Sequence, residues 1–362
     1  MWGRMASCGG LAIRLPHVLI LSCTGLAIAA PPAISEDSLR GHVSFLASDA
    51  LEGRATPSRG QEIAAEYIAA QFRRAGLEPV GNDGYFQSAT FEEAIKSVKN
   101  TGGARARLDA ASQHGGKIRN VVGLLRGSDP VLRDTYVILS AHYDHVGLAD
   151  KGDDQIYNGA NDDASGTASV IEIAAALAAQ PTRPKRSILF VAFFGEEIGL
   201  VGSQYYAKHP VVPLEKTIAD VNLEQVGRTD ATNGDMTGTA SFTGFDYSDL
   251  TKPFVREGQA MGIRVYKDDK GSDQYFTQSD NLPLAEAGVP AETLCVAFDY
   301  PDYHRVGDEW PKLNYKNMAA VDSMVAQGLL DLASDAPAPV WNADVAKTKP
   351  YRDAADKLHE GR

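Results

Sequence analysis

The chain has 362 residues, enough to bury one large hydrophobic core. Hydrophobic residues make up 44% of it and charged residues 23%, which is typical of a globular protein. The formal net charge is −12, and no run of Lys and Arg offers a surface for phosphate backbones. Composition and charge therefore argue against a nucleic-acid partner and against other polyanions.

The first 30 residues have the pattern of an export signal. Arg4 and Arg14 precede an apolar run at 18–30, and small residues near its end suit a signal peptidase. The run is too short to span a membrane comfortably, so we predict a signal peptide over 1–30, export to the periplasm or beyond it, and no membrane span. An ordinary buried first helix is one alternative. Lipid attachment at Cys23 is another, which the apolar residues after it disfavour.

Strand and helix patterns alternate along the rest of the chain. Apolar spacing predicts helices over 35–48 and 61–76, the second ending at Gly76, whereas 82–116 is polar, glycine-rich and only weakly strand-like. From residue 120 onward, apolar strand patterns alternate with helical ones. The strands are predicted at 120–125, 135–140, 186–194, 217–223 and 291–298, and the helices at 164–179, after 194 up to Tyr206, at 247–261 and at 315–332.

Near-continuous apolar strands between helices indicate a sheet that is covered on both faces. The predicted fold class is therefore α/β, a three-layer α/β/α sandwich with a central, mostly parallel (mixed) sheet. We expect a single domain over 31–335. The segment 336–362, which contains Pro and Lys, is expected to be a loosely held C-terminal tail.

Acidic and histidine side chains follow the ends of four predicted strands. In open α/β sheets, functional groups collect at the carboxyl ends of the strands, so we expect these side chains to meet at one edge. Each could by itself be a solvated loop charge, but solvation does not explain why so many gather at strand ends. The residues are His142, Asp144 and His145 after 135–140, Asp162 and Asp163 before 164–179, Glu196 and Glu197 after 186–194, Glu224 after 217–223, and Asp299, Asp302 and His304 after 291–298.

The types of these residues point to bound metal. Imidazole and carboxylate groups without thiolates suit zinc, manganese or cobalt. The carboxylates outnumber those of a structural zinc site, which is usually rich in Cys and His. Two metals that share one bridging carboxylate would use the set, and such a pair can activate a water molecule for attack on a carbonyl.

Five motifs carry these residues: AHYDHVG, NGANDDASG, FFGEEIGLVGS, NLEQVGR and YHRVGD. In this order they resemble the motifs of the co-catalytic zinc exopeptidase family, which includes secreted bacterial leucyl aminopeptidases, glutamate carboxypeptidases and, more distantly, glutaminyl cyclases. The resemblance covers most of the chain up to about Leu332, and the stretch from His42 to Pro79 is similar to the lead-in of the bacterial members. It implies one catalytic domain, two zinc ions and a peptide substrate. The segment between Phe86 and Lys117 is too short for the protease-associated insert of larger relatives.

The resemblance implies a role for each motif residue. Asp144 would fix the tautomer of the His142 imidazole, and the Asp162–Asp163 peptide bond would be cis, as it often is in the family. Glu196 would be the general base that takes a proton from the attacking water and passes it to the leaving amine. The implied zinc ligands are His142, Asp162 as the bridge, Glu197, Glu224 and His304.

Several positions depart from the family pattern, among them Asn281 and Leu284, where relatives frequently have His and Phe, and three others bear directly on the site. Glu224 stands where the best-known aminopeptidases have Asp, and its side chain, longer by roughly 1.5 Å, still suits a ligand. His145 stands where most relatives have another residue, and we expect it to be solvated or to lie behind a ligand rather than to bind metal. The tyrosine that helps stabilise the oxyanion in relatives aligns with Phe276, which leaves Tyr275 and Tyr303 as candidates. Histidines expected on the surface are His42, His114 and His209.

The predicted function is that of a metal-dependent aminopeptidase acting on peptides outside the cytoplasm. A carboxypeptidase of the same fold is the first alternative, since Arg228 and Arg305 lie near the site in the sequence and could bind a substrate carboxylate. A glutaminyl cyclase is disfavoured because those relatives tend to have Ser where this chain has Asp163. A binding protein that has lost the metals is disfavoured because every ligand position and the base are filled. The sequence indicates neither the oligomeric state nor the side-chain preference.

Overall fold

The computed structural model describes residues 1–3, 34–99, 101, 103–232, 234–334 and 336–360. Nearly all of the predicted signal peptide, including Cys23, lies outside these residues. Among the described helices, none is both long and apolar enough to cross a bilayer. The described residues between 34 and 360 form one compact unit, to which every described helix and strand belongs.

A nine-stranded mixed sheet forms the centre of this unit, with the order β1–β3–β7–β4–β8–β13–β11–β12 and with β2 paired to β3. The four central strands β7, β4, β8 and β13 are parallel, whereas β3 runs antiparallel to β7 and β11 antiparallel to β13. The mixed sheet is therefore confirmed. The strands are β1 (Glu78–Pro79), β2 (Phe86–Thr90), β3 (Lys117–Leu125), β4 (Tyr136–His142), β7 (Ser187–Phe193), β8 (Thr217–Glu224), β11 (Thr239–Phe242), β12 (Arg264–Tyr266) and β13 (Ala291–Cys295).

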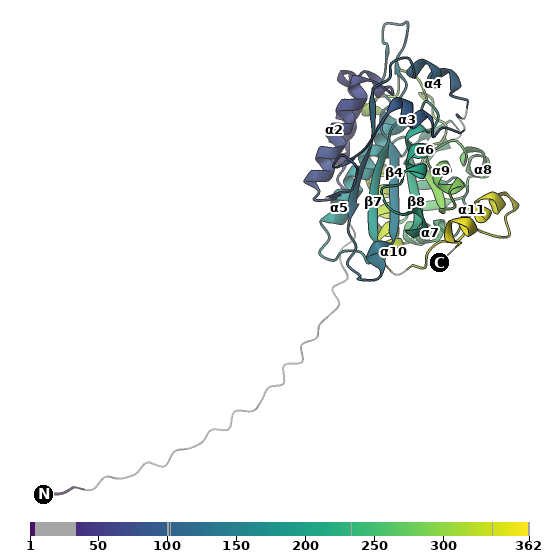
Figure 1. Ribbon diagram of the computed structural model, residues 1–362. Coiled ribbons are helices and arrows are strands. Elements are labelled where there is room, and N and C mark those ends of the chain that lie inside the picture. Colours follow the sequence, from purple (N-terminus) through teal and green to yellow (C-terminus); the bar gives the residue numbers. More distant parts are fainter. Residues whose placement is uncertain (4–33, 100, 102, 233, 335, 361–362) are drawn as a thin grey trace. The chain divides into compact units, whose positions relative to one another are not determined.

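Helices cover both faces of the sheet (Figure 1). Along β4, Val137 and Leu139 lie in one hydrophobic core and Ile138 lies in the other, because successive side chains of a strand point to opposite faces. The three-layer α/β/α sandwich is thus confirmed. On one side lie α1 (Glu36–Leu46), α2 (Arg59–Arg74), α5 (Gly166–Ala178), α7 (Thr251–Met261) and α10 (Tyr315–Ala333), and on the other α6 (Val201–Lys208), α9 (Asn281–Glu286) and α11 (Lys349–His359).

Helix α2 illustrates how the local sequence sets these elements. The hydroxyl of Ser58 accepts a hydrogen bond from the backbone N–H of Gln61 and so caps the first turn. Ile68 and Phe72, four residues apart, are fully buried on the face toward the sheet. The helix ends at Arg74, and Gly76 follows with a φ of 76°, which confirms the predicted glycine stop.

The C-terminal segment differs from the expected loose tail. Trp341 is buried, and its indole N–H donates to the carbonyl of Gly288 at 3.0 Å. Helix α11 packs against α9 (yellow and green in Figure 1), with Tyr351, Ala355 and Leu358 on its inner side. Their spacing of four and three residues is an amphipathic helical pattern, which the Pro and Lys content concealed. The expectation of a loosely held tail is therefore wrong.

Asp220 on β8 allows a prediction about stability. Its side chain is fully buried, Oδ1 accepts a hydrogen bond from Ser140 at 2.9 Å, and burial raises the pKa from an ordinary 3.8 to about 8. Between these two values the unfolded chain is ionised while the folded chain keeps the proton, so stability falls as pH rises through this window. Asp220→Asn mimics the protonated form at every pH. We therefore expect the unfolding free energy of the variant, relative to that of the natural chain, to be higher at pH 8 than at pH 4 by roughly 3–5 kcal/mol.

Denaturant unfolding at both pH values, with a chelator present, measures this gain. The exposed Asp153→Asn serves as the control and should show no such growth. If Asp220→Asn and the natural chain differed in unfolding free energy by the same amount at pH 4 and pH 8, the prediction would be contradicted.

Candidate metal centre

The chemistry-bearing side chains meet at one edge of the sheet. His142 and Glu224 are the last residues of β4 and β8, and Glu197 follows the end of β7. Asp162 lies in the short turn η3 (Ala160–Ser165) before α5, and His304 lies in the loop after β13. Because the central strands are parallel, their carboxyl ends lie at the same edge, as the sequence predicted.

Asp162 stands between two groups of donors. Its Oδ1 is 3.3 Å from Nε2 of His142, which is also 3.8 Å from Oε1 of Glu224. Its Oδ2 is 3.0 Å from Nε2 of His304, which is also 3.0 Å from Oε1 of Glu197. All five predicted ligands are therefore close together, and Asp162 offers one oxygen to each group.

Several of these atoms are buried without a partner. Within the described part of the chain, Oδ2 of Asp162, Oε1 of Glu197 and both ring nitrogens of His145 make no hydrogen bond. Unpaired buried polar atoms are costly and rare, so a cluster of them needs a ligand to satisfy it. One ligand atom each from His145, Asp162, Glu197 and His304 lies within 4.8 Å of the others. Nitrogen and oxygen donors in this arrangement fit a divalent transition metal such as zinc.

Asp144 lies behind His142. Nδ1 of His142 donates to the backbone carbonyl of Asp144 at 3.2 Å, whereas the Asp144 carboxylate is 3.6 Å away. A proton on Nδ1 leaves the Nε2 lone pair facing Asp162. The Asp144 carboxylate accepts instead from the hydroxyl of Thr56 at 3.0 Å and from the backbone N–H of Glu196 at 3.2 Å. Asp144 therefore links the end of β4, where His142 lies, to the loop that carries Glu196.

The backbone of the Asp162 turn is held from two directions. The carboxylate of Asp308 accepts hydrogen bonds from the backbone N–H groups of Asn161 and Asp162 at 3.0–3.1 Å. The side-chain oxygen of Asn161 accepts from the backbone N–H of Gly227 at 2.9 Å. The Asp162–Asp163 peptide bond is cis, as expected. Asp308 belongs to the motif YHRVGD, but its positioning role was not apparent from the sequence.

Glu196 is the carboxylate that remains free. It is half-buried and makes no hydrogen bond through its side chain with any described residue. Burial, together with the neighbouring carboxylates of Glu224 and Glu197, raises its pKa well above the ordinary value. A carboxylate with these properties can accept a proton from a nearby water.

Glu197 has the opposite environment. Burial and the Asp162 carboxylate would raise its pKa, but His145 and His304 outweigh them and hold the pKa at about 2. Its second oxygen, Oε2, accepts a hydrogen bond from the Arg107 guanidinium at 3.0 Å. Arg107 lies in α4 (Arg105–Ala111), inside the polar stretch 82–116, which carries no recognisable functional motif. Glu197 is therefore ionised, with Oε1 left for the cluster.

Arg54, at the end of η1 (Asp49–Arg54), holds the backbone next to the metal centre through hydrogen bonds. It is fully buried and donates to the backbone carbonyls of Tyr143 at 2.9 Å, Asn158 at 2.6 Å, Gly159 at 2.9 Å and Leu46. Burial lowers its pKa to about 10, so it stays charged at neutral pH. Arg54 therefore joins the loop after β4 to the segment before η3. No motif marks Arg54 in the sequence, although it lies in the lead-in that resembles bacterial relatives.

Two expectations about histidines are corrected. His145 is fully buried, with Nδ1 3.0 Å from Oε1 of Glu197, so the solvated alternative is wrong. His42 is also buried, and its ring nitrogens pair with the Tyr67 hydroxyl at 2.9 Å and with Oε1 of Glu172 at 2.8 Å. His42 occupies an inner position of α1, where the apolar side of that helix meets α5. The other two histidines placed on the surface are exposed as expected: His114 and His209.

Both tyrosine candidates border the cluster. A cavity of about 150 Å³ is lined by Tyr275 and Tyr303 together with carboxylates of the cluster. Phe276, at the aligned position, is buried against Tyr247 instead. A second cavity, of about 130 Å³, adjoins the cluster from the side of His304.

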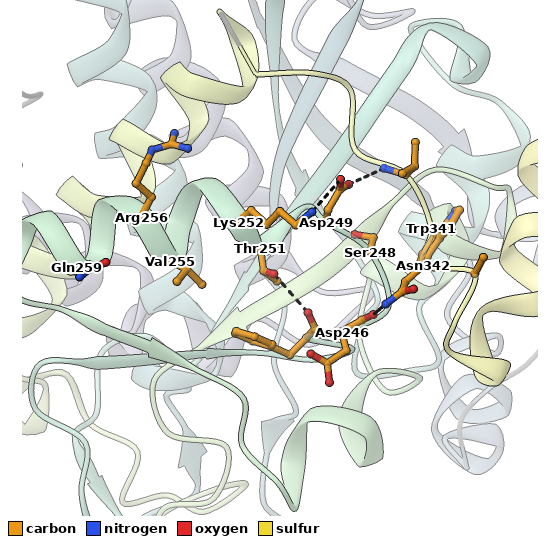
Figure 2. A pocket seen from close by; sticks show the side chains of 13 residues that line it. Asp246, Ser248, Asp249, Thr251, Lys252, Val255, Arg256, Gln259, Trp341 and Asn342 are labelled. Atoms are coloured by element: carbon orange, nitrogen blue, oxygen red, sulfur yellow. Dashed lines mark hydrogen bonds and ion pairs between the residues drawn. The ribbon is translucent and has the colours of Figure 1, made fainter.

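A larger cavity of about 820 Å³ lies between α7 and the segment 340–343 and shares no lining residue with these two (Figure 2). Its Asp249 accepts a hydrogen bond from the backbone N–H of Val340 and pairs with Lys252. Among the described residues that line it there is no His or Cys. This cavity lacks the donor set of the metal centre, so its size alone does not make it a reaction site.

Comparison with known proteins identifies the family. Residues 120–329, more than half of the chain, match the family described as Peptidase family M28. The chain belongs to peptidase family M28. This confirms the resemblance on which the ligand set was predicted.

Individual relatives match parts of their length. A "Probable zinc metalloprotease" of Pyrenophora tritici-repentis is 32% identical over 203 residues, which are 55% of this chain and 42% of the relative. "Leupeptin-inactivating enzyme 1" of Streptomyces exfoliatus is 23% identical over 306 residues, which are 84% of this chain and 59% of the relative. The chain thus spans about half the length of the curated relatives it matches. The solved structure of BSAP, a zinc aminopeptidase from Bacillus subtilis, has a TM-score of 0.62 at 15% identity, covering 87% of this chain and 100% of its own, and confirms the fold alone.

Proposed function

We propose that this chain is a zinc-dependent exopeptidase, and specifically an aminopeptidase that acts after export from the cytoplasm. The observation that carries the proposal is the pair of donor groups that share Asp162, with the free carboxylate of Glu196 beside them. The names of the relatives supply further support, since one is a probable zinc metalloprotease and the solved neighbour is a zinc aminopeptidase.

The cluster offers places for two zinc ions. His142, Asp162 and Glu224 would hold the first, and Asp162, Glu197 and His304 would hold the second. Zinc bound there would act as a Lewis acid that lowers the pKa of water and polarises the carbonyl of the peptide bond to be cleaved.

The remaining chemistry belongs to side chains of the protein. Glu196 takes a proton from the attacking water and delivers it to the leaving amine, for which its raised pKa is well suited. Tyr303 is the better candidate for a hydrogen bond to the oxyanion. Tyr303 is 42% exposed, but partial desolvation of its hydroxyl side and the carboxylates of Asp162 and Glu197 raise its pKa, so that the hydroxyl keeps the proton that it would donate. For Tyr275 the neighbouring carboxylates are Asp299 and Asp268, outside the cluster.

Two observations favour an aminopeptidase over a carboxypeptidase. The Arg228 guanidinium is buried and bonded to both oxygens of Asp230 at 2.6 Å and to Asp302 at 3.0 Å, so it has no free charge for a substrate carboxylate. The cavity beside the cluster is lined by the carboxylates of Glu196, Glu224 and other acids, which attract a substrate ammonium group. Of the two arginines considered from the sequence, only the exposed Arg305 remains open to a carboxylate.

The test uses one peptide in three forms, unmodified, N-acetylated and C-amidated, incubated with the purified chain. We expect acetylation to block cleavage and amidation to leave it intact, with single residues removed from the amino end as read by mass. A chelator should abolish cleavage and added zinc should restore it. Cleavage blocked by amidation would overturn the aminopeptidase assignment, and cleavage that resists the chelator would overturn the metal mechanism.

A further inference from the structure

His145 lies against the second donor group. Its side chain has no exposed surface, and Nδ1 is 3.0 Å from Oε1 of Glu197 and 3.8 Å from Oδ2 of Asp162. Nε2 of His304 faces the same two oxygens, at 3.0 Å from each. Two imidazole nitrogens and two carboxylate oxygens, from four separate segments of the chain, thus lie within 4.8 Å of one another.

These contacts are not those of a structural histidine. Neither ring nitrogen of His145 makes a hydrogen bond within the described part of the chain, and Oε1 of Glu197 is unpaired as well. His42 provides a comparison in the same molecule: its buried ring bonds to Glu172 at 2.8 Å and to Tyr67 at 2.9 Å. At 3.0 Å from a carboxylate, an imidazole N–H would normally point along the line to the oxygen, as it does for His42. The missing alignment at His145 leaves Nδ1 free to bind a cation.

The ring of His145 is fixed in this position by the neighbouring backbone. A Cβ on Gly159 would lie only 2.4 Å from Cγ of the His145 ring, so the ring occupies the space that this glycine leaves open. The carbonyl of Gly159 is itself held by Arg54 at 2.9 Å. Nδ1 therefore faces the cluster in a preset orientation, and little conformational freedom is lost when it binds.

Four of the six separations between these donors are known, and they lie near the edge length of a coordination tetrahedron. Zinc–nitrogen and zinc–oxygen distances of about 2.0–2.1 Å place the corners of a tetrahedron roughly 3.3–3.4 Å apart. The observed separations of 3.0 and 3.8 Å fall on either side of that value. Within the described residues, the ion pairs of Nε2 of His142 are with Asp162 at 3.3 Å and Glu224 at 3.8 Å.

We propose that His145 is a metal ligand through Nδ1, so that the second position has four protein donors and the first has three. The inference rests on the proposed binding of zinc and goes beyond the ligand set implied by the family. The two zinc sites are then unequal. The first equivalent of zinc binds at the site that includes His145, and the site that includes His142 keeps an open coordination position. The competing role for His145 is a positioning residue that contacts Glu197 but never the metal.

The experiment counts imidazole ligands on the first zinc. The zinc-free chain is loaded with one equivalent of zinc and measured by X-ray absorption. We expect two imidazoles per zinc, from His145 and His304, and one in His145→Gln. In a chelator competition, the first equivalent should bind at least about 100-fold more weakly to His145→Gln, because even residues behind the ligands contribute about 10- to 100-fold to metal affinity. The exposed His114→Gln serves as the control and should match the natural chain in both measurements.

Each outcome has a separate meaning. One imidazole per zinc in the natural chain, or two retained in His145→Gln, would overturn the ligand role. No zinc bound at all would overturn the proposed function itself, and with it the inference. If His145→Gln fails to fold, as judged by circular dichroism of the zinc-free protein, the imidazole count of the natural chain still decides.

Discussion

Replacing Glu196 with Gln is expected to lower kcat by about 10³- to 10⁴-fold while the zinc content stays unchanged, since general acid–base catalysis contributes roughly 10²- to 10⁴-fold and this residue serves in two successive proton transfers. Gln has the same shape but cannot take up the proton of water. Because the Glu196 side chain makes no hydrogen bond with any described residue, the change leaves no buried partner unpaired. KM should change by only a few-fold if Glu196 acts mainly in the transition state.

Steady-state kinetics and metal analysis of the same preparations measure these quantities. Glu286→Gln, an exposed glutamate on α9, is the matched control and should keep the natural kcat. A kcat within a few-fold of the natural value would exclude Glu196 as the base. A large loss of zinc in Glu196→Gln would instead make Glu196 a ligand, because a base that stays off the metal contributes little to its affinity.

The long elements of the fold were predictable because their patterns are local. The apolar stretches at β4, β7 and β8 are buried on both faces, and they gave strands within two residues of the observed bounds. The short elements between residues 78 and 116 escaped, because a two-residue strand such as β1 or a seven-residue helix such as α4 has no period to detect. Helix α11 escaped for another reason: its apolar residues are sparse, and their partial burial depends on contact with α9.

The candidate ligands were predictable because each sits in a motif at the end of a strand, and parallel strands bring those ends together. The residues that orient them were not. Arg107 reaches Glu197 across 90 positions of sequence, and no local pattern marks such a contact. The burial of His145 is equally non-local, since it depends on the space left by Gly159 and on the approach of His304. Chemistry near a strand end can therefore be read from sequence more readily than the packing that controls it.

Arg54→Met is expected to lower the free energy of unfolding of the zinc-free chain by about 3–5 kcal/mol, the cost of breaking a buried network that contains a charge. The substitution keeps the length of the side chain but removes every donor. The backbone carbonyls of Leu46, Tyr143 and Asn158 would lose the donor that Arg54 supplies, while that of Gly159 keeps the backbone N–H of Ala164 at 3.2 Å. Each unsatisfied buried group costs about 1–3 kcal/mol before the structure relaxes. Zinc affinity should fall as well, because Arg54 joins the loop that directly follows His142 to the segment before Asp162.

Denaturant unfolding with a chelator, followed by zinc titration, separates these two effects. Arg59→Met, an exposed arginine five positions along the chain, should change the unfolding free energy by less than about 0.5 kcal/mol. Arg54→Lys should fall between the natural chain and Arg54→Met, because an ammonium group keeps the charge but cannot reach four carbonyls in the fixed directions of a guanidinium. If Arg54→Met were as stable as Arg59→Met, the carbonyls would be satisfied in some other way, and Arg54 would not be what holds the two loops of the metal centre together.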